Sequence, residues 1–188
     1  ETFRIVGFGD SLMAGFNLGP GEGFTDRLQA ALRAKGLDVS VANAGVSGDT
    51  SSGGLARLDW SVPDGTRLVI LELGANDMLR GVSPAIPEKN LDEMLAKLKA
   101  RRIAVLLAGM RAAPNLGADY QNAFDAIYPK LAEKYGVPLY PFCLDGVAGV
   151  PALQLGDGLH PNAKGVDVMV ERILPTVEKA IAGAGGAS

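Results

Sequence analysis

The sequence predicts an α/β protein in which helices cover both faces of a parallel sheet. Short runs of β-branched and other apolar residues alternate along the chain with segments whose apolar residues recur at helical spacing. The strand-like runs are apolar at nearly every position, which is typical of parallel strands that are covered on both faces. We therefore expect one three-layer α/β/α sandwich with a parallel sheet of about five strands.

The predicted elements alternate along the chain. Candidate strands cover residues 3–8, 37–45, 67–74, 102–110 and 136–142. The helical segments are marked by these apolar residues: Leu28, Ala31 and Leu32; Leu91, Met94, Leu95 and Leu98; Tyr120, Phe124, Ile127 and Leu131; and Val166, Met169, Val170, Ile173, Val177 and Ile181. Gly36 predicts the end of the first of these helices, and Pro175 predicts a kink in the last.

Length and composition fit one globular domain. The chain has 188 residues, of which 47% are hydrophobic, so we expect a single domain over residues 1–183 and a frayed tail at 184–188. The net charge is −3 and the 18 basic residues form no run, which argues against nucleic-acid binding. The longest apolar run, residues 103–110, is too short for a membrane-spanning segment. A single cysteine, Cys143, excludes an intrachain disulfide and a cysteine-rich metal site.

Polar residues follow the predicted strands, where an open α/β sheet binds its ligands. The segment "GFGDSLMAGFN" places Ser11 directly after the first strand. Further polar clusters follow other strands at 43–50, 74–79 and 108–115. The only histidine, His160, lies in "DGLHPN" before the last helix. Because histidine ordinarily titrates close to neutral pH, His160 is the candidate base for Ser11.

Acyl transfer by a serine needs a base, a group that orients the base, and donors for the developing oxyanion. Asp157 precedes His160 by three residues, so its carboxylate can accept a hydrogen bond from the Nδ1–H of the imidazole. For the oxyanion we nominate the backbone N–H groups of Ser11 and Gly48 and the side-chain amide of Asn76. Together these residues supply every group that the reaction needs.

Simpler roles compete with this interpretation. A turn or a helix cap would also explain Ser11, and we expect supporting roles for Asp10, Asp49 and Asp77. The segment around Ser11 lacks the G-x-G-x-x-G spacing and the Lys-Ser/Thr pair of nucleotide-binding loops. It also lacks the G-x-S-x-G pattern of the α/β-hydrolase nucleophile. The hypothesis that remains is a Ser–His–Asp site on a different α/β fold.

Four short blocks occur in order: "GDSL" at 9–12, "SGDT" at 47–50, "GAND" at 74–77 and "DGLH" at 157–160. With them the chain resembles the SGNH (GDSL) hydrolase superfamily, in particular its bacterial thioesterase I, lysophospholipase and arylesterase branch. The resemblance implies a flavodoxin-like sheet, no cofactor and no metal. It implies Ser11 as nucleophile, His160 as base and Asp157 as the orienting acid, with Ser11, Gly48 and Asn76 as oxyanion donors. It slightly favours a periplasmic or secreted location over a cytoplasmic one, and it leaves a preceding leader and homo-oligomers open.

The predicted function is hydrolysis of acyl or aryl esters by a serine esterase through an acyl-enzyme intermediate. Thioesterase and lysophospholipase activities fit the same chemistry. We expect these residues to form an apolar wall for the acyl or aryl group: Leu12, Met13, Phe16, Leu79, Leu116, Val150 and Leu153. Two alternatives remain, an acyltransferase or carbohydrate deacetylase that uses the same three residues, and a non-catalytic binding module on the same fold.

Overall fold

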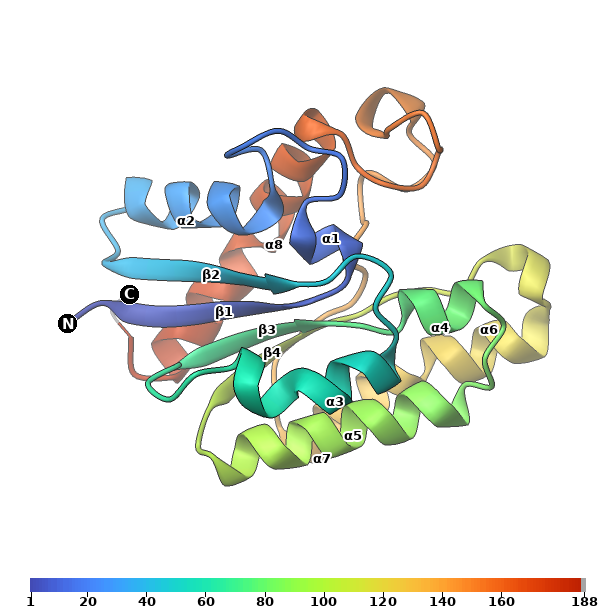
Figure 1. Cartoon of the computed structure of the whole chain (residues 1–188), viewed down its shortest axis with the longest axis horizontal. Helices are drawn as coiled ribbons and strands as arrows, with labels where there is room; N and C mark the ends of the chain where they lie inside the picture. The colour runs from blue at the N-terminus through green and yellow to red at the C-terminus, as the bar shows by residue number, and fades with distance from the viewer. Residues whose placement is uncertain (187–188) are drawn as a thin grey trace.

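The computed structural model describes residues 1–186 and has a five-stranded sheet at its centre (Figure 1). The strands are β1 (Phe3–Gly9), β2 (Val39–Gly45), β3 (Leu68–Glu72), β4 (Ala104–Ala108) and β5 (Leu139–Tyr140). They lie in the order β2-β1-β3-β4-β5, and every neighbouring pair is parallel. The predicted fold class is confirmed, and the strand order is that of the flavodoxin-like fold.

Helices cover both faces of the sheet. The longer helices are α2 (Phe24–Ala34), α3 (Ser51–Ser61), α5 (Ala85–Ala100), α7 (Ile127–Tyr135) and α8 (Ala163–Gly183). The shorter ones are α1 (Ser11–Ala14), α4 (Ala75–Leu79) and α6 (Ala118–Asp125), with 3₁₀ turns at Pro114–Leu116 and Pro151–Leu153. Helices α2 and α8 pack together on one face, and α3, α5 and α7 lie on the other (Figure 1).

The helix ends follow the local sequence signals. Gly36 adopts a left-handed backbone with φ of 84° just after α2, as its prediction as a helix stop requires. Asn162 caps α8, because its side chain accepts the N–H of Gly165 at 2.9 Å. Pro175 lies inside α8, and the helix continues through it to Gly183. Gly186 still donates its N–H to Ile181 at 2.8 Å, while residues 187–188 of the predicted frayed tail lie outside the described residues.

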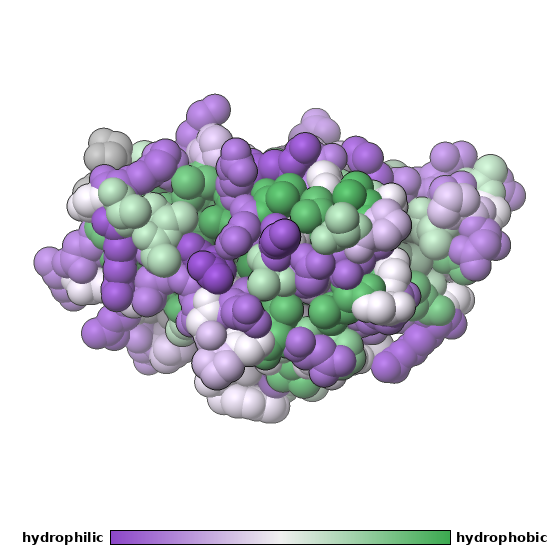
Figure 2. All heavy atoms as spheres, turned by 90° about the horizontal axis from the view of Figure 1, so that it is seen from above, coloured by the Kyte–Doolittle hydropathy of each residue, from purple (hydrophilic) through white to green (hydrophobic). Residues whose placement is uncertain are grey.

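The core lies on both faces of the central strands. All five residues of β3 are buried, and Arg4 is the one exposed residue of β1. Burial on both faces explains why these strands are continuous apolar runs in the sequence. Figure 2 views the molecule from above and shows hydrophilic residues over most of that face, with hydrophobic residues between them. Among residues 1–186, no helix combines the length and the apolarity that crossing a membrane requires.

The strand order places a crevice at one edge of the sheet. The chain goes from β1 to β2 on one side and reaches β3 on the other side of β1. Ligands of open α/β sheets bind beyond the carboxyl ends of the strands at such a reversal. Ser11 follows β1 directly, and Asn76 follows β3. The fold therefore brings the segments that carry these two residues to the same crevice.

Candidate active site

Ser11 is the first residue of α1, at the end of β1. The preceding residue, Asp10, caps this short helix, because its Oδ1 accepts the N–H of Leu12 at 3.1 Å. The helix ends after Ala14 at Gly15, whose φ of 83° is left-handed. A strand followed at once by a capped turn fixes the Ser11 side chain at the carboxyl edge of the sheet. The supporting role expected for Asp10 is thus visible in the structure.

His160 lies in a closed loop before α8. Two hydrogen bonds close the loop: the N–H of Leu155 donates to the His160 carbonyl at 2.8 Å, and the N–H of Asn162 donates to the Leu153 carbonyl at 3.0 Å. Inside the loop, Asp157 Oδ1 accepts the N–H of Leu159 at 2.9 Å and the N–H of His160 at 3.0 Å. The other oxygen, Oδ2, lies 2.5 Å from Nδ1 of His160. The carboxylate therefore fixes both the turn and the imidazole.

These contacts also fix the charge of Asp157. The N–H of Leu159, the His160 side chain and the His160 N–H all stabilise its carboxylate, and they lower the pKa of Asp157 to about 2. Asp157 is therefore an acceptor at neutral pH. Nδ1 of His160 must then carry the hydrogen that it donates, which leaves Nε2 as the acceptor of a neutral imidazole.

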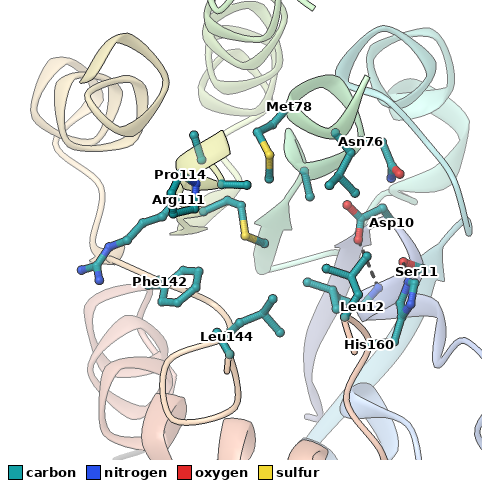
Figure 3. Close-up of a pocket in the computed structure, with 17 residues that line it drawn as sticks. Asp10, Ser11, Leu12, Asn76, Met78, Arg111, Pro114, Phe142, Leu144 and His160 are labelled. Atoms are coloured by element: carbon teal, nitrogen blue, oxygen red, sulfur yellow. Dashed lines mark hydrogen bonds between the residues drawn. The ribbon is translucent and has the colours of Figure 1, made fainter. Parts of the chain in front are cut away.

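Ser11 and His160 meet across the crevice. Ser11 Oγ lies 2.9 Å from His160 Nε2, although the two residues are separated by 149 positions in the chain. The ring of Phe16 packs against the imidazole, with 4.4 Å between the ring centroids. Figure 3 shows Ser11 and His160 side by side at one end of the pocket. The structure thus brings the three residues predicted for nucleophile, base and orienting acid into one hydrogen-bonded chain.

The three predicted oxyanion donors come from three consecutive strand ends. The N–H of Ser11 follows β1, the N–H of Gly48 follows β2, and the amide of Asn76 follows β3. Within residues 1–186, neither of the two backbone N–H groups has a hydrogen-bond acceptor. Asn76 Nδ2 donates one hydrogen to the Asp49 carbonyl at 2.9 Å, and its second hydrogen remains available for a ligand.

The turn that carries Asn76 requires a glycine before it. Gly74 has a φ of 118°, and a Cβ at this position would lie 2.1 Å from the Tyr128 hydroxyl. That hydroxyl donates to the Leu73 carbonyl at 2.7 Å, and burial raises the pKa of Tyr128 well above its ordinary value, so the donor keeps its proton. Asp77 accepts from both the N–H and the hydroxyl of Ser51 at 2.7 Å. The loops after β2 and β3 are therefore tied together, which matches the supporting role expected for Asp77.

Two buried carboxyl groups lie close to Ser11. Asp10 and Glu72 are 1% and 2% exposed, and the N–H of Asp10 donates to Glu72 Oε1 at 3.2 Å. Burial raises the pKa of Glu72 well above its ordinary value, and the neighbouring Asp10 raises it further. Burial also raises the pKa of Asp10, against the hydrogen bonds that it accepts. The pair therefore holds protons more tightly than exposed carboxyl groups do.

An apolar cavity of about 290 Å³ opens beside Ser11 (Figure 3). Of the residues predicted for its wall, Leu12 and Leu79 line it, and Phe16 covers the imidazole instead. Leu116, Val150 and Leu153 do not belong to its lining, and neither does the buried Met13. These wall residues were not predicted from the sequence: Met78, Met110, Phe142, Leu144, Ala148 and Leu159. Their position after strands β3, β4 and β5 is the feature of the sequence that could have identified them.

Comparison with known proteins assigns this chain to a family. The sequence pattern of the GDSL-like lipase/acylhydrolase family matches residues 8–168. The chain belongs to that family. A relative, esterase TesA of Pseudomonas aeruginosa, is 40% identical over 179 residues, which cover 95% of this chain and 88% of that protein. An arylesterase of Vibrio mimicus is 42% identical over 163 residues, which cover 85% of this chain and 80% of that protein.

A solved structure extends the comparison to three dimensions. The SGNH-hydrolase family esterase AlinE4 is 49% identical to this chain and superposes with a TM-score of 0.81. The alignment covers 96% of this chain and 97% of AlinE4. The family match and these relatives confirm that this chain is an ester-hydrolysing enzyme, and they indicate small ester substrates.

Proposed function

We propose that Ser11, His160 and Asp157 carry out ester hydrolysis in two acyl-transfer steps. The observation that supports this most directly is the unbroken chain from Ser11 Oγ through the imidazole to the Asp157 carboxylate, with separations of 2.9 and 2.5 Å. Both distances are within the reach required of a nucleophile, a general base and the group that orients the base.

In the first step, Ser11 Oγ attacks the ester carbonyl while Nε2 of His160 takes the hydroxyl proton. A C–O bond forms, and the negative charge develops on the former carbonyl oxygen. The N–H groups of Ser11 and Gly48 and the free hydrogen of Asn76 Nδ2 donate to this oxygen. The tetrahedral intermediate then expels the alcohol, which receives the proton from the imidazolium, and Ser11 is left acylated.

In the second step, His160 removes a proton from water and the resulting nucleophile attacks the acyl carbonyl. The acid leaves, Ser11 regains its proton, and the site returns to its starting state. The Asp157 carboxylate stays ionised throughout and stabilises the imidazolium in both steps. No group other than these side chains and water is needed to balance the reaction.

The cavity favours uncharged acyl or aryl groups of small to moderate size. Its wall is built from apolar side chains such as Met110, Phe142 and Leu144, and its volume is about 290 Å³. Burying an apolar chain there gains roughly 0.8 kcal/mol for each CH₂ group. An aryl group is a further candidate, in keeping with the name of the Vibrio mimicus relative.

A covalent probe of the serine tests this proposal. Ethyl p-nitrophenyl methylphosphonate should add one phosphonyl group to the intact protein and abolish hydrolysis of p-nitrophenyl butyrate. Ser11→Ala should take up no label, and His160→Ala should take it up far more slowly, with both variants folded by circular dichroism. Stoichiometric labelling of Ser11→Ala, or its hydrolysis at the rate of the unchanged protein, would exclude Ser11 as the nucleophile and leave a binding module or another site.

A further inference from the structure

The oxyanion donors proposed above belong to three separate loops, so their convergence depends on how those loops are held together. The side chain of Arg57 lies where the loops meet. Arg57 belongs to α3, and its side chain is only 12% exposed. Burying a guanidinium is costly unless each of its hydrogen-bonding positions is used.

The guanidinium contacts the ends of β1 and β2 and the loop that follows β2. Its Nη2 donates to the Gly9 carbonyl at 2.9 Å, and its Nη1 donates to the Ala44 carbonyl at 2.8 Å. Its Nε donates to Asp49 Oδ2 at 2.7 Å. The plane of the group lies over the Phe8 ring, 4.2 Å from the centroid. Three acceptors from three positions of the chain thus share one rigid donor.

Two of these acceptor residues, Gly9 and Asp49, lie within two positions of a proposed oxyanion donor in the chain. Gly9 is the last residue of β1 and precedes Ser11 by two residues. Asp49 follows Gly48 directly, and the backbone carbonyl of Asp49 accepts Asn76 Nδ2 at 2.9 Å. Asp49 therefore joins Arg57 to the second and third donors at once, through its side chain and its backbone.

We propose that Arg57 is a positioning residue for the oxyanion hole, because it sets the separation between the donors on the loops after β1, β2 and β3. Arg57 does not touch the substrate in this role. The inference rests on the proposed function of Ser11, Gly48 and Asn76. The inference adds that the guanidinium of Arg57 determines how well the three donors on these loops converge.

The shape of the guanidinium is essential to the role. Its planar fork presents five N–H donors in fixed directions, whereas a lysine ammonium is a single point on a flexible stem. Lysine keeps the charge and can bond one of the acceptors, but it cannot span Gly9, Ala44 and Asp49 together. Arg57→Lys is therefore the variant that separates geometry from charge.

The test compares Arg57→Lys with the unchanged protein in p-nitrophenyl butyrate hydrolysis, under conditions where urea titration shows both to be folded. Losing one oxyanion donor typically costs about 10²–10³ in kcat, and misplaced donors should cost less, so we expect about a 10- to 100-fold fall in kcat with KM nearly unchanged. The inhibition constant of butylboronic acid, whose serine adduct has a tetrahedral boron that bears an oxygen at the oxyanion position, should rise by a similar factor. A fall in affinity for substrate alone, with kcat and boronate binding intact, would overturn the proposal.

Arg101 provides the matched control. Its side chain is 26% exposed and also bridges a backbone carbonyl and a carboxylate, donating to Val62 at 2.7 Å and to Asp64 at 3.3 Å. It lies at the end of α5, near the amino ends of the strands and away from the crevice. Arg101→Lys should leave kcat unchanged. An equal loss of kcat in both variants would mean that Arg57 acts only through general stability.

A double-mutant cycle with Asn76→Ala identifies the route of the effect. If Arg57 positions Asn76, Arg57→Lys should lower kcat much less in the Asn76→Ala background than in the unchanged protein. An equal fall in both backgrounds would contradict positioning through Asn76. Should Arg57→Lys fail to fold, Asp49→Ala removes the Nε contact alone, and unchanged kcat in that variant would refute the inference.

The phosphonate label separates the two proposals. If the unchanged protein takes up no label at Ser11, the proposed function is wrong whatever Arg57 does. If the unchanged protein is labelled and Arg57→Lys hydrolyses at the same kcat, only the positioning role of Arg57 is wrong.

Discussion

Asp157→Asn should be far more damaging than its small change in shape suggests. Oδ1 of Asp157 accepts two backbone N–H groups, from Leu159 at 2.9 Å and from His160 at 3.0 Å. An asparagine must turn its carbonyl oxygen to these donors, because its amide nitrogen cannot accept them. The amide NH₂ group then faces His160 Nδ1, in the position of the carboxylate oxygen Oδ2.

That arrangement inverts the imidazole. Nδ1 must accept from the amide, so the proton of the neutral ring moves to Nε2 and faces Ser11 Oγ at 2.9 Å. His160 then donates to Ser11 where it has to accept. The same inversion in serine proteases lowers kcat by about 10⁴, which corresponds to roughly 5.5 kcal/mol of transition-state stabilisation. We expect a loss of this size with the turn intact.

The assay is the kcat of p-nitrophenyl butyrate hydrolysis between pH 5 and 8, with unfolding followed in urea. Asp38→Asn is the control, since Asp38 is an exposed carboxylate that contacts Thr2 near the start of β2. The control should retain full activity. The pH profile of the unchanged protein over this range should show no contribution from Asp157, whose pKa is lowered to about 2. A loss below about tenfold in Asp157→Asn would refute the assignment of the tautomer.

Three further changes test other parts of the site. Asn76→Ala should lower kcat by about 10²–10³ with KM little changed, and a change in KM alone would contradict an oxyanion role. The free energy of unfolding of Glu72→Gln should increase relative to that of the unchanged protein as pH rises from 4 to 8. Burial raises the pKa of Glu72, so the unchanged protein loses stability as pH rises toward that raised value. Urea titrations at both pH values measure the difference, and a constant difference would refute the cause given. Ala148→Phe narrows the cavity, so it should lower the rate of hydrolysis of p-nitrophenyl octanoate more than that of p-nitrophenyl acetate. A panel of p-nitrophenyl esters of different acyl length measures the difference.

The meeting of the polar blocks was predictable because parallel strands end at one edge. Ser11, Gly48 and Asn76 follow three strands that are neighbours in the sheet, in the order β2, β1, β3. The contact between Ser11 and His160 was predictable for a chemical reason, since the chain has one histidine. Periodicity alone carries no information about two residues that are 149 positions apart.

The wall of the cavity was predicted only in part, because hydrophobicity does not tell which cavity a side chain faces. Leu153 is a partly buried residue that packs on the core, and its carbonyl helps close the His160 loop. Leu116 also packs on the core, from the 3₁₀ turn whose first residue, Pro114, lines the cavity. Phe142 and Leu144 do line it, but the short strand β5 gives little sign of where its following loop turns.

The sequence gives only a weak indication that Arg57 is buried and needs partners. It follows Gly54 by three positions and precedes Leu58 by one, and both of those residues are buried on α3. A charged residue on the buried stripe of a helix needs partners, and here the partners are two strand-end carbonyls and Asp49. Neither carbonyl can be recognised in the sequence, because every residue has a backbone carbonyl.

Dividing the proposed oxyanion donors among three loops has a physical consequence for the whole sheet. Two of the donors are backbone N–H groups, which no side-chain substitution removes directly, so their placement depends on the packing of β1, β2 and β3. A change that shifts β2 or β3 by a few tenths of an ångström would misalign a donor while leaving the Ser11–His160 contact in place. Because His160 comes from the loop before α8 and not from these strands, proton transfer and oxyanion stabilisation should respond separately to mutation. Residues that hold the strand ends together are therefore where stability and rate are most directly coupled.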